Sequence, residues 1–146
     1  MTTDDSSVFI ETTFNSSIES VWEAWTNPIE LMKWFGSDPK GTVLKAETDL
    51  RPGGYFEVTF RDADLTEHTC SGIYDEVQTL YKLAFSWQWK SEPGVASFII
   101  VLLTPEGTST RMQFEHKNLG TGSKHNYAVG WQITFSKLER VLEIQP

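Results

Sequence analysis

Large apolar residues near the C-terminus recur at three- and four-residue steps, a spacing typical of one face of a helix. The pattern predicts a helix over residues 124–143. A helix of roughly 20 residues is about 30 Å long, about the diameter of a small domain. The stripe needs a large apolar surface to pack on, and it consists of Tyr127, Trp131, Phe135, Leu138 and Leu142.

Two shorter helices are predicted near the N-terminus. Ser16 and Glu19 have the spacing of a capping box, which opens a helix that runs to about Thr26. Asn27 before Pro28 marks a second start, with asparagine as the N-cap and proline at the first helical position. This second helix extends through residue 35, where glycine and then proline end it.

The central part of the chain alternates apolar and polar residues with the period of a β-strand. One predicted strand, residues 97–103, is apolar on both faces, and we therefore expect it in the interior of the sheet. Another places Tyr81, Leu83, Phe85, Trp87 and Trp89 on one face. The predicted strands are residues 8–14, 42–47, 55–61, 66–77, 81–89, 97–103 and 110–117.

The order of these elements is strand, two short helices, six strands and a long helix. Short turns join the last six strands, so they form an antiparallel meander that curls around the C-terminal helix. The predicted fold class is α+β with a helix-grip layout and about seven strands. We expect one domain over residues 1–146, with residues 1–6 disordered.

Composition and charge limit the classes of partner that the protein is expected to bind. The formal net charge is −8, and no cluster of Lys and Arg stands out. Nucleic acids and anionic membranes need concentrated positive charge, so the sequence predicts neither as a partner. A neutral ligand or a basic protein face remains open.

Cysteine usage and hydropathy indicate the compartment. The single Cys70 excludes an intrachain disulfide. The N-terminus lacks the basic and apolar regions of a signal peptide, and no apolar run approaches the roughly 18 residues of a membrane span. We expect a cytoplasmic protein.

Candidate chemistry is sparse. His68, His116 and His125 come from different elements without the regular spacing of metal ligands, so no metal site is predicted. The loop at residues 120–124 lacks the spacing of a phosphate-binding loop, and no cofactor is predicted. Cys70 lies on a strand, where a small buried residue is expected, and no catalytic residues are predicted.

The aromatic residues are the strongest remaining signal: six Trp, nine Phe and four Tyr. Those on the inner face of the sheet, Trp89 among them, should face the long helix. They are either a packed core or the lining of an apolar cavity, and we expect a cavity because a strongly curved sheet is difficult to fill. Tyr74, His116 or Tyr127 would then orient a ligand.

The chain resembles the activator of Hsp90 ATPase homologue-like proteins of the START-like (SRPBCC) superfamily. The resemblance extends over residues 8–143. The family often has a histidine three residues before the Gly-Trp pair of the last helix, where this chain has Tyr127. The matching segments are residues 21–28 (VWEAWTNP), 31–35 (LMKWF), 49–56 (DLRPGGYF), 72–77 (GIYDEV), 82–87 (KLAFSW), 107–108 (GT), 114–116 (FEH) and 130–131 (GW).

The resemblance implies a START/Bet v-like helix-grip fold with a pocket between the sheet and the C-terminal helix. It implies less about activity, because the superfamily includes co-chaperone domains, lipid carriers and polyketide cyclases or aromatases. A monomer and a homodimer are both compatible with it. The extra N-terminal domain of the eukaryotic co-chaperones is not seen in the sequence.

Three hypotheses follow. The first is non-enzymatic binding of a small hydrophobic or aromatic ligand under the long helix. The second is a co-chaperone domain that contacts an Hsp90-type chaperone. The third is a cyclase- or aromatase-like enzyme using Tyr74 and His116 as acid and base. The expected cavity residues are Trp25, Phe35, Phe56, Val58, Phe60, Tyr74, Phe85, Trp87, Met112, Phe114, His116, Tyr127, Trp131 and Phe135.

Overall fold

The computed structural model describes residues 7–119 and 126–144. The expectations for residues 1–6, for His125 and for the 120–124 loop lie outside the described residues. Within the described part, the helices are α1 (Ile18–Thr26), α2 (Pro28–Leu31) and α3 (Tyr127–Ile144). The strands are β1 (Val8–Phe14), β2 (Thr42–Thr48), β3 (Tyr55–Arg61), β4 (Glu67–Gln78), β5 (Lys82–Trp89), β6 (Ala96–Glu106) and β7 (Ser109–Lys117).

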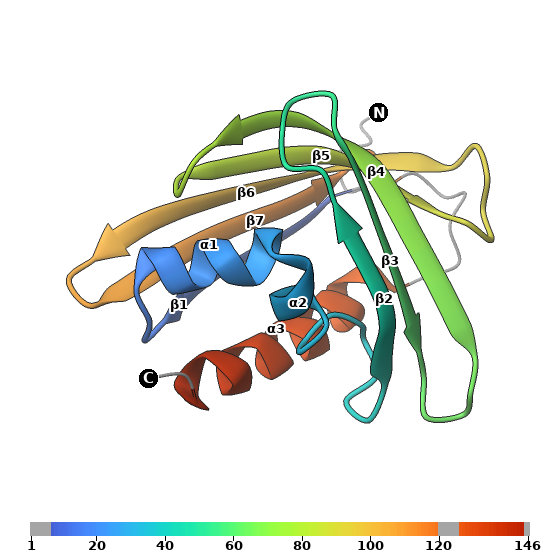
Figure 1. Cartoon of the computed structure of the whole chain (residues 1–146), viewed down its shortest axis with the longest axis horizontal. Coiled ribbons are helices and arrows are strands. Elements are labelled where there is room, and N and C mark those ends of the chain that lie inside the picture. The colour runs from blue at the N-terminus through green and yellow to red at the C-terminus, as the bar shows by residue number, and fades with distance from the viewer. Residues whose placement is uncertain (1–6, 120–125, 145–146) are drawn as a thin grey trace.

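The described strands form one seven-stranded antiparallel sheet in the order β1-β7-β6-β5-β4-β3-β2. Strands β2 to β7 are therefore the predicted meander. Strand β1 pairs with β7, with Val8 opposite His116 and Phe14 opposite Thr110. The sheet curls around α3, and α1 lies beside α3 on the same concave side (Figure 1). This is the predicted helix-grip α+β fold.

Two irregularities accompany the curvature of the sheet. The register shifts between Val43 and Lys45 in β2 and between Tyr74 and Glu76 in β4. Such bulges bend a strand and increase its twist. Close to the second bulge, β5 approaches β4 at Gly72 so tightly that a Cβ atom there would lie 1.8 Å from the Ser86 carbonyl oxygen. Only glycine permits this approach.

The helix starts differ in detail from the sequence prediction. The N-cap of α1 is Ser17, whose hydroxyl accepts from the Ser20 amide, whereas Ser16 donates to the Leu142 carbonyl of α3. Asn27 caps α2 as predicted, accepting from Ile29. Helix α2 ends at residue 31 rather than 35, because the chain continues as a turn. Helix α3 starts at residue 127, later than predicted.

Alternation along the strands places the apolar side chains on the concave face. In β5, Leu83, Phe85, Trp87 and Trp89 are buried as predicted. Tyr81 is not part of this face, because it lies in the turn before β5 and its side chain is 53% exposed. Leu80, in the same turn, has a φ of +77°. Strand β6 lies in the interior of the sheet, as predicted, and its outward side chains are partly covered or exposed.

Candidate functional site

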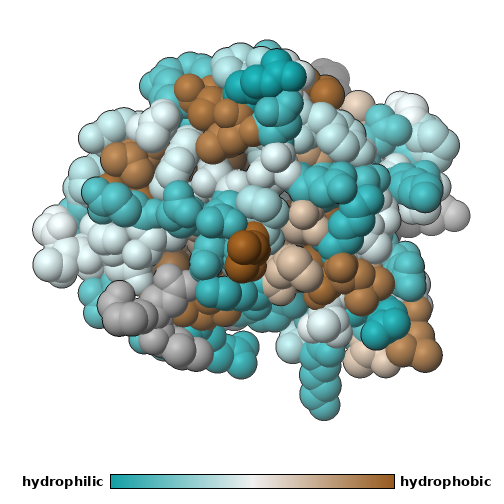
Figure 2. All heavy atoms as spheres, viewed as in Figure 1, coloured by the Kyte–Doolittle hydropathy of each residue, from teal (hydrophilic) through white to brown (hydrophobic). Residues whose placement is uncertain are grey.

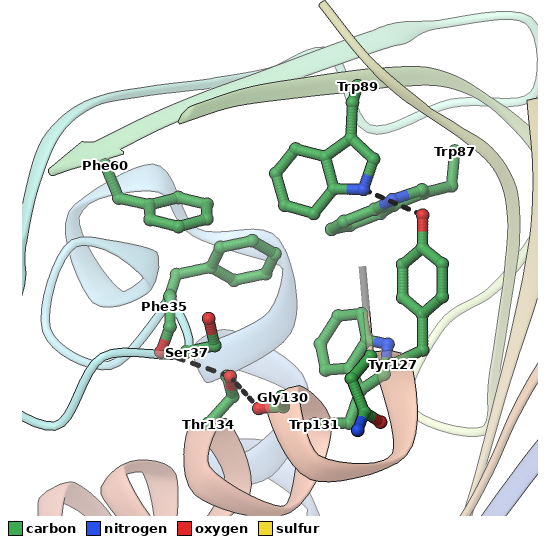
Figure 3. A pocket seen from close by; sticks show the side chains of 11 residues that line it. Phe35, Ser37, Phe60, Trp87, Trp89, Tyr127, Gly130, Trp131 and Thr134 are labelled. Atoms are coloured by element: carbon green, nitrogen blue, oxygen red, sulfur yellow. Dashed lines mark hydrogen bonds between the residues drawn. The ribbon is translucent and has the colours of Figure 1, made fainter. Parts of the chain in front are cut away.

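A pocket of about 100 Å³ lies between the N-terminal half of α3 and the concave face of the sheet (Figure 3). Strands β3 and β5 form one wall, α3 forms another, and the segment after α2 closes a third side. Ser37 and Asn126 are exposed, so the pocket reaches solvent beside them. Its lining residues are Phe35, Gly36, Ser37, Phe60, Trp87, Trp89, Asn126, Tyr127, Gly130, Trp131 and Thr134.

Strand and helix periodicity place the aromatic walls. Trp87 and Trp89 are two residues apart in β5 and therefore point to the same face. Tyr127 and Trp131 are four residues apart in α3 and lie on one side of the helix. Phe35 follows the turn after α2, and its side chain lies between the wall formed by β5 and the wall formed by α3.

The rings pack closely around the pocket. The ring centroids of Phe35 and Trp87 are 6.0 Å apart, those of Phe35 and Trp131 are 6.0 Å apart, and those of Trp87 and Trp131 are 5.3 Å apart. Phe60 lies edge-on to Phe35 at 6.1 Å. Because each ring is supported by others, the walls are stiff, and a planar apolar ligand would meet ring faces and edges.

Glycines form the side of the pocket opposite the sheet. Gly36 has φ +106°, a conformation that favours glycine, and a Cβ atom there would lie 3.0 Å from the Phe60 ring. Gly130 lies in α3, and a Cβ atom at this position would have the Ser37 side chain as its nearest neighbour, at 3.4 Å. The bare backbone of Gly130 therefore leaves room beside Trp131, at a position where most helical residues would carry a side chain.

Two hydrogen bonds fix the orientation of the aromatic walls. Trp89 Nε1 donates to the Tyr127 hydroxyl at 2.7 Å and joins β5 to the first turn of α3. Trp131 Nε1 donates to His116 Nδ1 at 3.0 Å and joins α3 to β7. Both bonds connect the helix to the sheet at the pocket.

His116 is a fully buried, neutral base in this arrangement. Because Nδ1 accepts from Trp131, the ring proton is on Nε2, which donates to the Ser97 hydroxyl at 2.7 Å. Burial lowers the pKa of His116 to about 3. Both ring nitrogens are engaged, and His116 does not line the pocket.

No ionisable carboxylate, ammonium, guanidinium or imidazole group occurs among the described residues that line the pocket. Its polar groups are hydroxyls, an amide, indole N–H groups and backbone. The Thr134 hydroxyl donates to the carbonyl groups of Gly36 and Gly130, so it is already used within the fold. An uncharged ligand suits such a lining, since a charged one would lose hydration without a counter-charge.

The structure divides the fourteen expected cavity residues into three groups. Five line the pocket: Phe35, Phe60, Trp87, Tyr127 and Trp131. Phe35 also lines a deeper void of about 20 Å³, together with Trp25, Phe56, Val58, Tyr74 and Phe85. The remaining four, Met112, Phe114, His116 and Phe135, line neither space and are buried in the core.

Packing explains the third group. The Phe114 ring lies 4.6 Å from Trp131 and 4.9 Å from Phe135, and Trp131 stacks on Phe135 at 5.4 Å. The middle of α3 therefore rests directly on β7, and the expected hollow beneath Phe135 is filled by side chains.

Six pocket residues are absent from the list of expected cavity residues: Gly36, Ser37, Trp89, Asn126, Gly130 and Thr134. Alternation had already placed Trp89 on the inner face beside Trp87, and Thr134 follows Gly130 by one helical turn, so periodicity could have indicated it too. Gly36 and Ser37 carry no such signal, because a loop crossing is a non-local event.

The other candidate groups are placed elsewhere. His68 Nε2 lies 2.9 Å from an Asp62 carboxylate oxygen, and Cys70 is completely buried. Burial raises the pKa of the Tyr74 hydroxyl, so the group is neutral. Within residues 7–119 and 126–144, no three His, Cys, Asp or Glu side chains gather as metal ligands would. Among the same residues, no helix has the length and apolar character to cross a membrane.

The curled sheet, the gripped helix and the pocket between them define a START-like helix-grip protein. A family model described as activator of Hsp90 ATPase homolog 1-like protein matches residues 15–143. The chain belongs to this family. A comparison with curated protein sequences finds no match.

Similar solved structures agree with this fold. Protein CV1439 from Chromobacterium violaceum has a TM-score of 0.84 and 20% identity, covering 97% of this chain and 99% of that one. The AHSA1-like protein from Aeromonas hydrophila has a TM-score of 0.81 and 21% identity, covering 94% and 92%. DynU16, a putative protein in the dynemicin biosynthetic locus, has a TM-score of 0.78 and 22% identity, covering 96% of this chain and 48% of that one.

Proposed function

We propose that this protein binds a small, uncharged, largely aromatic or apolar molecule in the pocket between β5 and the N-terminal half of α3, without catalysing a reaction on it. The observation that carries the proposal is the lining itself: aromatic rings on several sides and no carboxylate, ammonium, guanidinium or imidazole group among the described lining residues. Ligand sites are commonly concave and apolar with a few placed polar groups.

Volume limits the ligand. An engineered apolar cavity of about 150 Å³ binds benzene, and this pocket measures about 100 Å³. The enclosed part of the ligand is therefore no larger than about one ring, and any further part extends past Ser37 and Asn126. A ring that buries about 150–200 Å² gains roughly 4–5 kcal/mol, which corresponds to a Kd on the order of 1 mM to 0.2 mM.

An NMR titration tests this proposal. Toluene, phenol and indole are added to the ¹⁵N-labelled protein, and we expect saturable shifts at Gly130, Trp131 and the Trp89 indole N–H. Gly130→Leu places a side chain at the pocket and should weaken binding at least about tenfold. Val129→Leu adds a similar side chain at the neighbouring position, which is 49% exposed, and should leave binding unchanged. Absence of saturable shifts with every probe would refute the proposal.

A second candidate function is contact with an Hsp90-type chaperone, supported by the description of the family. A binding measurement with the Hsp90 of the same cell at low salt tests it. Pocket variants such as Gly130→Leu should not affect that contact, whereas they should weaken ligand binding. The enzymatic alternative has less support, because Tyr74 faces the deeper void while His116 has both nitrogens engaged in the core.

A further inference from the structure

A second hollow lies on the other side of the loop that closes the pocket. It runs between α2, the start of β2 and the C-terminal half of α3, and its volume is about 330 Å³. Small-molecule sites commonly have volumes of about 300–1,000 Å³. We call it the basic groove, and it is lined by Met32, Lys33, Phe35, Pro39, Gly41, Thr42, Val43, Lys137, Arg140 and Val141.

The basic groove is separate from the pocket. Both lie along α3, but the pocket uses positions up to Thr134 and the groove begins at Lys137. The segment after α2 crosses the helix between them. Thr134 Oγ1 donates to the Gly36 carbonyl at 3.1 Å, and Lys137 Nζ donates to the Asp38 carbonyl at 2.9 Å. Among the described residues, Phe35 alone lines both spaces.

Positive charge gathers in this groove, although the chain carries a net charge of −8. Lys33, Lys137 and Arg140 line it, and its described lining includes no carboxylate. Lys33 is paired with Glu30 at 3.0 Å. Arg140 is exposed and makes no ion pair or hydrogen bond with the described residues. A guanidinium that no described residue pairs with is available to an anion.

Lys137 adds a second, partly desolvated cation. Burial lowers the pKa of the Lys137 ammonium group. The negative charges of Asp38 and Asp62 raise this pKa, and the positive charge of Arg140 lowers it. The two side chains are three residues apart in α3 and both line the groove, so their positive charges repel each other. An anion bound between them would relieve this repulsion and restore the lost solvation.

The floor of the groove is apolar. Met32 is 43% exposed, and Phe35, Val43 and Val141 are covered or partly covered beneath it. Hydrophobic and hydrophilic residues lie side by side over the region where α2 and β2 are seen in Figure 1 (Figure 2). An occupant that satisfies both parts of the groove must have an apolar body and an anionic end.

We propose that the basic groove binds free amphiphilic carboxylates of the medium-chain fatty-acid kind. The acyl chain of the ligand lies on Met32, Val43 and Val141, and its carboxylate lies between Lys137 and Arg140. Charge complementarity selects the anion, and the volume suits a small molecule rather than a protein segment. This site does not depend on the proposed function of the pocket.

NMR titration with three probes tests the site. Decanoate, below its micelle concentration, carries both the chain and the charge, decanol carries only the chain, and acetate carries only the charge. Decanoate should give saturable shifts at Val43, Lys137 and Arg140 that weaken when NaCl is raised from 50 to 500 mM. Decanol and acetate should bind at least about fivefold more weakly.

Variants assign the anionic end. Arg140→Gln should weaken decanoate binding about three- to tenfold, and Arg140→Lys should restore most of it. Lys90→Gln is the matched control, since Lys90 is an exposed cation in the turn after β5, outside the groove. Equal affinity for decanol, equal affinity in Arg140→Gln, shifts confined to pocket residues, or binding of an acidic peptide in place of decanoate would each overturn the inference.

Discussion

His116 shows at the scale of one residue how this protein combines burial with polarity. The side chain is completely buried, yet both ring nitrogens have partners, Trp131 and Ser97. A buried polar group with satisfied hydrogen bonds costs little, whereas the loss of one partner costs about 1–3 kcal/mol. The arrangement stabilises only the neutral ring, because Nδ1 accepts a hydrogen bond and an imidazolium cannot.

Stability should therefore fall in mild acid. The folded state holds His116 with a pKa of about 3, and the ordinary value is 6.5. Below pH 6.5 the unfolded chain binds a proton that the folded protein does not, so the free energy of unfolding decreases by about 1.4 kcal/mol per pH unit. We expect a loss of roughly 2 kcal/mol between pH 7 and pH 5, measured by urea unfolding.

Two controls isolate this effect. His116→Gln should be less stable at pH 7 but should lose its pH dependence between pH 7 and pH 5, whereas His68→Gln should retain it. The ordinary pKa is 3.8 for Asp38 and Asp64 and 4.5 for Glu76, and hydrogen bonding lowers all three pKa values. These carboxylates therefore change the stability mainly at pH values below this range. A His116 ring that titrates above pH 5 by NMR would contradict the prediction.

Among the elements, β4 and β5 determine how tightly the sheet curls. Gly72 of β4 pairs opposite Phe56 of β3, and it lies against the backbone of β5 near the register shift. A side chain at this position would separate the two strands. Since Trp87 and Trp89 project from β5, that separation would also displace a wall of the pocket.

Gly72→Ala should therefore destabilise the protein strongly. The new methyl group would lie 1.8 Å from the Ser86 carbonyl oxygen, and backbone must move to accept it. We expect a loss of about 3 kcal/mol or more in urea unfolding. Gly94→Ala is the matched control: its φ of +86° carries strain but nothing lies within 4 Å, so a loss of about 1–2 kcal/mol is expected. Equal losses would show that the close approach is unimportant.

At the scale of the whole molecule, Phe35 is a shared wall. It lines the pocket, the deeper void and the basic groove, and it belongs to the segment that crosses α3. The three spaces are separate in this structure partly because this ring lies between them. A smaller side chain at this position would connect the pocket to the deeper void.

Phe35→Leu should enlarge the ligands that the protein accepts. The substitution should cost about 1–2 kcal/mol, because the ring is buried and a void remains. Naphthalene, which exceeds the present pocket, should then raise the melting temperature of the variant more than that of the original protein. Phe114→Leu removes a core ring that lines none of the three spaces, and it should lose stability without gaining naphthalene binding. A similar gain in both variants would contradict the role of Phe35 as a wall.

Sequence reasoning succeeded where the signal is local. The stripe from Tyr127 to Leu142 predicted α3 because side chains three and four residues apart share a helix face. Alternation predicted the inner faces of β3 and β5 for the same kind of reason, and short turns predicted the meander. It failed at Tyr81, which belongs to the turn before β5 and not to the strand, and in the length of α2, where a turn ends the helix earlier than expected.

The open space was decided by tertiary structure alone. Phe114 has the same aromatic character and the same strand alternation as Phe60 and Trp87, yet Phe114 packs against Phe135 of α3 whereas Phe60 and Trp87 border a pocket. A void is the small difference between the separation of packed elements and the volume of their side chains. That separation depends on the bulges in β2 and β4 and on the crossing of α3 by residues 36–39, which are contacts between distant parts of the chain. The sequence by itself therefore determined the elements and the faces that meet, and the curvature and crossing of those elements determined where they leave room for a ligand.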